Sequence, residues 1–167
     1  MASMYQISVP VYVRRLNGLA GCLKKAQALY SEKKYDESSL MLQRLFPDMF
    51  TFARQVQAAT DHARASGARL AGLEPPALDA EEKSIADLIA RVEKTVAFLK
   101  TLKPEQIDGS EEKTISFKMR GNDVNYKGLD FLLNSNMANF YFHLTIAYAI
   151  LRANGVEVGK RDYMGPA

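Results

Sequence analysis

Apolar residues recur three or four positions apart along four long stretches of the chain, which is the spacing of one face of an α-helix. The first stretch begins at Ser8, a residue type that favours the N-cap position, and runs to about Glu32. A short helical piece, DESSLMLQRLF, follows it. The second long helix is predicted to start after Pro47, with Asp48 as its cap, and to end before two consecutive prolines.

Two further long helices are predicted in the second half of the chain. Asp79 and Glu82 have the spacing of a capping box at the start of the third helix, which ends at Pro104. A short helical segment from about Gly128 leads into the fourth helix, which covers about residues 134–153 and is terminated by an Asn-Gly pair.

Between the third and fourth helices the apolar period changes to two, which indicates β-strand. Ile115 and Phe117 alternate with polar residues, and the chain is predicted to turn at Gly121 and Asn122 into a second strand. An isolated hairpin is marginal in water, so its apolar side chains must lie against the helices. The predicted fold class is therefore all-α: a four-helix bundle, in a single domain of residues 1–167, with a small β-hairpin between helices 3 and 4.

Charge is spread evenly along the sequence. The chain has 22 Lys and Arg residues against 19 Asp and Glu residues, for a formal charge of +3. Because there is no basic stripe that could neutralise a row of phosphates, nucleic acid is not an expected partner.

The longest apolar run, around FYFHLTIAYAIL, is shorter than the roughly 18 residues that suggest a membrane span, so no membrane partner is expected either.

Cys22 is the only cysteine, so no disulfide can form within the chain, and a cytoplasmic location is predicted. Several familiar catalytic motifs are absent from the sequence, among them a glycine-rich phosphate loop, a Cys-x-x-Cys pair, Gly-x-Ser-x-Gly and His-Glu-x-x-His. Cys22 lies within a helical pattern, and we interpret it as a core residue because buried structural thiols are inert. A nucleophilic Cys22 is the alternative.

Two histidines, His62 and His143, lie on the second and fourth long helices. On the fourth helix Asn136, Asn139 and His143 share a face, because residues three or four apart on a helix point the same way. On the second helix Gln55 and His62 form a similar strip. If both strips face the bundle axis, these side chains converge on a small pocket of the kind that helical bundles use for metals and ligands. The alternative is that each histidine is a hydrogen-bonded core residue.

Three blocks of the sequence, MYQISVPVYVRRL, FPDMFTFARQVQAATDHARASGARLAG and NFYFHLTIAYAILRANGVEVGKRDYMG, extend over nearly the whole chain. With them the chain resembles the DinB/YfiT-like superfamily of predicted metalloenzymes. The resemblance is to a bacterial branch of that superfamily, a family defined as a domain of unknown function.

The resemblance implies a site in which three histidines, one from the second helix and two spaced i, i+4 on the last, hold a divalent metal such as zinc or nickel. His62 matches the histidine of the second helix, and His143 matches the later member of the pair. The earlier member falls on Asn139, and a neutral amide is a poor zinc or nickel ligand compared with imidazole. The resemblance therefore implies a metal site of His62, His143 and Asn139 that binds metal only weakly.

Three functions remain open from the sequence. The first is a degenerate metal site or small-molecule pocket between the second and fourth long helices. The second is a metal-dependent transferase or hydrolase, in which a bound metal activates water or a thiol. The third is a structural or interaction homodimer, which family analogy suggests, as do the aromatic residues that point around much of the fourth helix: Phe140, Tyr141, Phe142 and Tyr148.

Overall fold

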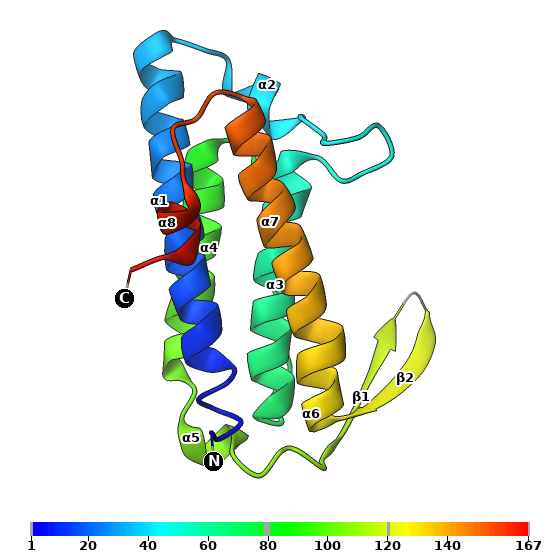
Figure 1. Cartoon of the computed structure of the whole chain (residues 1–167). Helices are drawn as coiled ribbons and strands as arrows, with labels where there is room; N and C mark the ends of the chain where they lie inside the picture. Colours follow the sequence, from blue (N-terminus) through cyan, green and yellow to red (C-terminus); the bar gives the residue numbers. More distant parts are fainter. Residues whose placement is uncertain (1, 79–80, 120, 167) are drawn as a thin grey trace.

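Four long helices pack side by side in a computed structural model that describes residues 2–78, 81–119 and 121–166 (Figure 1). They are α1 (Val9–Lys33), α3 (Phe52–Leu70), α4 (Ile85–Thr101) and α7 (Ala138–Ala153). Helix α1 contacts α4, and α3 contacts both α4 and α7. The predicted mostly helical fold with one hairpin is confirmed. No helix among the described residues is both long enough and apolar enough to cross a membrane.

Helix α1 begins one residue after Ser8, as the sequence predicts. The Ser8 hydroxyl does not cap the helix, because it donates to the Met4 carbonyl oxygen at 2.6 Å. Pro10 lies in the first turn, where its missing N–H leaves no hydrogen bond unmade. The helix ends at Lys33, and Lys34, which follows it, adopts a left-handed conformation with φ 55°.

The predicted start of α3 at Asp48 is wrong. Its cap is Thr51, whose hydroxyl accepts from the Arg54 N–H. The preceding helix α2 (Glu37–Met41) is also shorter than predicted, because residues 42–51 form a loop. This loop is closed at its base, where the Phe52 N–H donates to the Gln43 carbonyl oxygen at 2.6 Å.

Helix α4 begins later than the sequence predicts. Its N-cap is Ser84, and Ser84 and Asp87 form a capping box in which each side chain accepts from the other residue's backbone N–H. Asp79 lies outside the described residues, and Glu82 binds Arg91 instead of capping the helix. After α4, a single turn that was not predicted, α5 (Pro104–Ile107), leads towards the hairpin.

The hairpin pairs β1 (Thr114–Met119) with β2 (Asn122–Lys127) in antiparallel register. Met119 lies opposite Asn122, so Asn122 belongs to the second strand and not to the turn, which corrects the predicted turn by one residue. Gly121, with φ +83°, supplies the left-handed conformation that a tight turn requires. The rings of Phe117 and Tyr126 both lie against Phe131, so the hairpin packs on the helices as predicted.

The segment before α7 is not a regular α-helix. A short turn, α6 (Gly128–Asp130), continues into a π-helical segment, η1 (Phe131–Met137), and only then into α7. Past α7, Gly155 terminates the helix with φ +78°. An additional helix, α8 (Lys160–Met164), packs on α1, where the Asp162 carbonyl oxygen would lie only 2.7 Å from a Cβ at Gly18.

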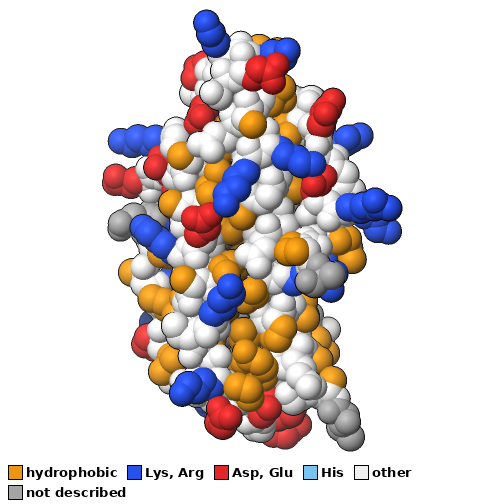
Figure 2. Space-filling model, turned by 90° about the vertical axis from the view of Figure 1, so that its left-hand side faces the viewer, with side chains coloured by type: hydrophobic (Ala, Val, Ile, Leu, Met, Phe, Trp, Pro, Cys, Tyr) orange, Lys and Arg blue, Asp and Glu red, His pale blue; other side chains and the backbone are white. Residues whose placement is uncertain are grey.

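Charged side chains of both signs are interspersed with apolar ones on the face shown in Figure 2. This distribution agrees with the even spread of charge along the sequence.

Candidate functional site

His62 of α3 and His143 of α7 meet at the contact between the two helices. Their ring centroids are 5.7 Å apart and their planes differ by only 12°. His143 is buried, and His62 is partly exposed. The structure therefore brings together the two histidines that lie about eighty residues apart in the sequence.

A glutamine side chain holds the His143 ring. The Nδ1 atom of His143 lies 2.7 Å from the Gln55 side-chain oxygen, Oε1. The amide nitrogen of Gln55 donates in turn to the Phe50 carbonyl oxygen at 3.4 Å. Gln55 is almost completely buried, so one amide joins His143 to the loop that precedes α3.

An asparagine holds the His62 ring in a similar way. The Nδ1 atom of His62 lies 3.3 Å from the Asn136 side-chain oxygen, Oδ1. Asn136 is buried and belongs to η1, the π-helical segment. Such segments are rare and occur frequently at functional sites.

Asn139, the third predicted site residue, lies one turn before His143 and is exposed. Its amide nitrogen donates to the Ser135 carbonyl oxygen at 2.7 Å. Of the residues on this face, it is Asn136 that contacts His62. Sequence spacing places both asparagines on the strip of His143 and contains no signal for choosing between them.

Two phenylalanines flank the His143 ring. Phe50 lies parallel to it, with the centroids 5.8 Å apart, and Phe142 meets it edge-on at 5.3 Å. Phe50 and Phe142 are 46% and 55% exposed, so the histidine pair lies at the surface edge of the core and not at its centre. The Arg54 guanidinium covers the Phe50 ring at 5.4 Å.

Both imidazoles are neutral at neutral pH. Burial, together with the smaller effects of the nearby His62 and Arg54 side chains, lowers the pKa of His143 to about 4. Burial also lowers the pKa of His62, against the opposing effect of its hydrogen bond to Asn136. Neutral imidazole is the form that coordinates metals and accepts hydrogen bonds.

The side chains present are a partial match to a metal site. Since zinc lies about 2.0–2.1 Å from an imidazole nitrogen, two rings with centroids 5.7 Å apart are near enough to share one ion. Within residues 2–78, 81–119 and 121–166, however, no group of three or more His, Cys, Asp or Glu side chains could hold a metal. Two imidazoles provide less than the three protein ligands of a typical catalytic zinc site.

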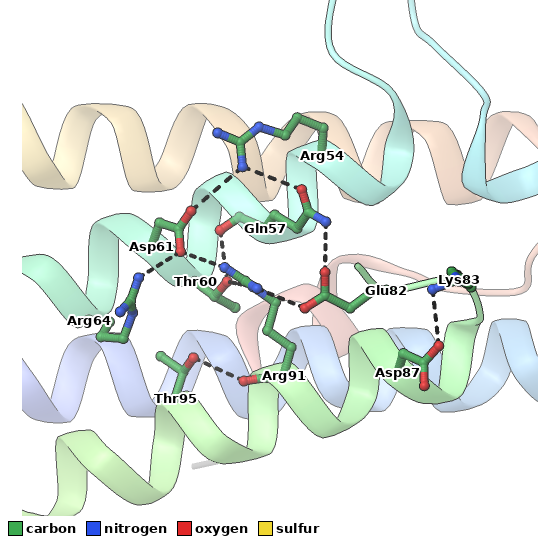
Figure 3. Close-up of polar contacts among 10 residues, drawn as sticks. All are labelled: Arg54, Gln57, Thr60, Asp61, Arg64, Glu82, Lys83, Asp87, Arg91 and Thr95. Atoms are coloured by element: carbon green, nitrogen blue, oxygen red, sulfur yellow. Dashed lines mark hydrogen bonds and ion pairs between the residues drawn. The ribbon is translucent and has the colours of Figure 1, made fainter. Parts of the chain in front are cut away.

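A second polar cluster, which the sequence did not predict, joins α3 to α4 (Figure 3). The buried Arg91 guanidinium donates to Thr60 at 2.7 Å, to Glu82 at 2.7 Å and to Asp61 at 2.5 Å. Asp61 also accepts from Arg64 at 3.0 Å. Arg91 lies next to apolar positions of α4, and a single arginine beside an apolar stripe does not reveal such a cluster from sequence alone.

The structure is that of a mostly helical protein with one small β-hairpin and a pair of adjacent histidines. Residues 4–164 match the model of the family described as "Domain of unknown function (DUF1993)", and the chain belongs to that family. It is also similar to a protein from Shewanella denitrificans whose crystal structure is described as that of a DinB family member. The two are 34% identical over 98% of this chain and 92% of the other, with a TM-score of 0.86. No curated protein matches the chain. The DinB-like resemblance is thereby confirmed.

Proposed function

We propose that the four long helices form a DinB/YfiT-like four-helix bundle that keeps a small-ligand site between α3 and α7 in place of a complete metal site. The observation that carries this proposal is the pair of adjacent neutral imidazoles, His62 and His143, each hydrogen-bonded through Nδ1 to a side-chain amide oxygen. Two such rings at the edge of a core can bind a group that neither ring could hold firmly alone.

The chemistry of the site selects the class of ligand. Neutral imidazoles accept a hydrogen bond or coordinate a borderline metal ion, and they offer no negative charge. The ligand therefore carries an N–H or O–H donor, or is a transition-metal ion. The partly exposed rings of Phe50 and Phe142 beside His143 supply apolar walls, as in most small-molecule sites.

A divalent metal, zinc or nickel, would be held by His62 and His143, with Asn139 as a weak third ligand. When bound, such an ion lowers the pKa of a coordinated water or thiol, which is the basis of the alternative function as a metal-dependent transferase or hydrolase. We expect weak binding because the amide is a poor ligand for these ions.

Replacing Asn139 with histidine tests the metal hypothesis. Asn139→His places a second imidazole one turn before His143, so affinity for zinc or nickel should rise by orders of magnitude in a calorimetric titration. Asn134→His adds an exposed histidine in the preceding segment η1 and serves as the matched control, with little expected gain. An Asn139→His protein that binds metal no better than the parent would contradict the proposed ligand set.

The small-molecule form of the proposal is tested by a thermal-shift screen of metabolites against the chelator-treated protein. A true ligand raises the melting temperature by mass action. The same compound should not stabilise a His62→Ala or a His143→Ala variant. A compound that stabilises both variants as much as the parent binds elsewhere, and a screen without hits would favour a structural role.

The predicted homodimer and the cytoplasmic location remain predictions. One observation favours an interaction surface: the loop before α3 exposes large apolar side chains at Leu42, Leu45 and Phe46. Exposed apolar patches of this kind often mark protein contacts.

A further inference from the structure

The hydrogen bonds of the histidine pair determine which ring nitrogen carries the proton. A neutral imidazole has one N–H donor and one lone-pair acceptor, and the partner of one nitrogen decides the state of the other. At His143 the partner of Nδ1 is the Gln55 amide, whose orientation is fixed because its nitrogen donates to the Phe50 carbonyl oxygen. The oxygen that faces Nδ1 can only accept, so the proton of His143 lies on Nδ1.

At His62 the partner of Nδ1 is also an amide oxygen, which can only accept. Its Nδ1 faces the side-chain oxygen of Asn136 at 3.3 Å, so Nδ1 is the donor. Among the described residues, the hydrogen bonds of both rings are made through Nδ1. The Nε2 lone pairs of the two rings therefore remain to accept a ligand.

We propose that Gln55 and Asn136 are positioning residues: they fix both imidazoles as Nδ1–H tautomers, so that the site presents two Nε2 lone pairs to its ligand. This inference rests on the proposed function, because it names the atoms with which the proposed site binds its ligand. It follows that the ligand is either a metal ion or a molecule with an N–H or O–H group that donates to Nε2. An anion without such a donor would not bind to the two lone pairs.

The cost of burying these two amides supports a role beyond packing. Gln55 and Asn136 are only 1% and 2% exposed. Burying an amide costs free energy unless the amide is hydrogen-bonded. The side-chain oxygen of each of these two residues faces an imidazole nitrogen. At metal sites, removing outer-shell groups that orient histidines in this way typically lowers metal affinity or activity about 10–100-fold.

The test measures the tautomers directly, by two-bond ¹H–¹⁵N correlation spectra of the full chain after treatment with a chelator and at neutral pH. The wild-type protein should show Nδ1 protonated and Nε2 unprotonated in both histidines. A wild-type spectrum in which Nε2 of either ring carries the proton would overturn the proposal, whatever the variants do.

Variants assign the cause. Gln55→Leu removes the acceptor and should release His143 to the Nε2–H form, whereas Gln55→Glu keeps an acceptor and should retain the Nδ1–H form. Gln43→Leu, at an exposed glutamine in the adjacent loop, is the control and should leave the spectrum unchanged. Asn136→Leu and Asn136→Asp form the corresponding pair for His62. If a leucine variant fails to fold, the wild-type and acidic-variant spectra still decide the question.

The outcome is separate from that of the proposed function, because the spectra need no ligand. If both rings are Nδ1–H tautomers but no ligand is found, the positioning roles of Gln55 and Asn136 stand and the proposed ligand-binding function does not. If a ligand binds but the rings are Nε2–H tautomers, the proposed function stands and the positioning roles do not.

Discussion

The His143 ring lies where a charged imidazolium would be poorly solvated. Phe50 stacks on one face of the ring, Phe142 meets it edge-on, and the nearest polar group is the Gln55 amide. An amide oxygen accepts a hydrogen bond but carries no full negative charge, so it cannot stabilise the imidazolium cation as a carboxylate would. His143 is therefore held as a neutral acceptor, which suits a ligand site better than an ion pair.

His143 should make the folded protein less stable as the pH falls below neutral. The pKa of its ring is about 4 in the folded protein against an ordinary value of 6.5. Between these pH values the unfolded chain binds more protons than the folded one, so the free energy of unfolding should fall as the pH is lowered through this window. His62, whose pKa is lowered in the same direction, adds to the loss.

Urea unfolding of the metal-free protein at about pH 7 and about pH 5 measures this loss. The His143→Gln variant lacks one of the titrating rings, and its unfolding midpoint should change less between the two pH values. An equal pH dependence in the two proteins would show that other groups are responsible.

The histidine pair could be predicted from the sequence, but its hydrogen-bond partners could not. Family resemblance places His62 opposite His143. Asn136, and not Asn139, contacts His62 because Asn136 lies in the π-helical segment and is buried there. No pattern in the sequence predicts that π-helical segment. Gln55 was placed on the strip of His62, but its pairing with His143 depends on a side-chain direction that only the structure supplies.

At the scale of elements, α3 carries two polar contacts that share neighbouring residues. His62 faces α7, whereas the preceding Asp61 binds Arg91 of α4. Arg54, one of the cations near Asp61, also covers the Phe50 ring that stacks on His143. The buried cluster between α3 and α4 thus helps to fix the helix that presents His62.

Truncation of Arg91 should be strongly destabilising. Arg91 is 4% exposed and neutralises Glu82 and Asp61, so Arg91→Ala leaves two carboxylates without their main partner. Breaking a buried ion pair from one side costs about 3–5 kcal/mol. Chemical denaturation at neutral pH measures the loss of free energy of unfolding.

Lys94, an exposed lysine on the same helix, provides the control. Lys94→Ala should change the free energy of unfolding by only about 0.5 kcal/mol or less. The loss of stability in Arg91→Lys should lie between those of the other two variants, because an ammonium keeps the charge but cannot reproduce the geometry of the three hydrogen bonds. A loss of stability in Arg91→Ala no larger than that in Lys94→Ala would contradict the structural importance of the cluster.

Elements with a clear apolar period were predicted well, and those defined by tertiary contacts were not. The start of α1 at Ser8 and the strands of the hairpin agree with the sequence. Asp48 is a good capping residue by type, but the loop closure between Gln43 and Phe52 delays α3 until Thr51. Local propensity does not predict this loop closure, because its hydrogen bond joins Gln43 and Phe52 at opposite ends of the loop.

At the scale of the whole molecule, the aromatic residues of α7 are better covered than the sequence suggested. Phe140 is buried, Tyr141 packs on Phe140, and Tyr148 packs on Tyr163 of α8. Of the four aromatic residues that motivated the homodimer, only Phe142 is largely exposed. The C-terminal helix α8, which was not predicted, contributes one contact: the Tyr163 ring meets Tyr148, and the Tyr163 hydroxyl is hydrogen-bonded to the Thr145 hydroxyl.

Exposed apolar side chains are concentrated instead near the loop that precedes α3. The residues that carry them between α1 and α3 are Tyr35, Leu42, Leu45, Phe46 and Phe50. Figure 1 shows this loop projecting from one end of the long helices, with the hairpin at the other end. A surface of this kind is a better basis for a dimer than α7 is.

The homodimer prediction is therefore tested at the loop. Light scattering at micromolar concentration should give about twice the chain mass of 18.6 kDa. Phe46→Asp places a charge on the apolar loop, at a side chain that is 64% exposed, and should reduce the mass to that of one chain. Met119→Lys, at an exposed apolar position of the distant hairpin, should leave the mass unchanged. A wild-type mass near 18.6 kDa would contradict the dimer. A dimer that survives Phe46→Asp would place its interface elsewhere, and Phe142, the exposed aromatic of α7, is then the next position to change.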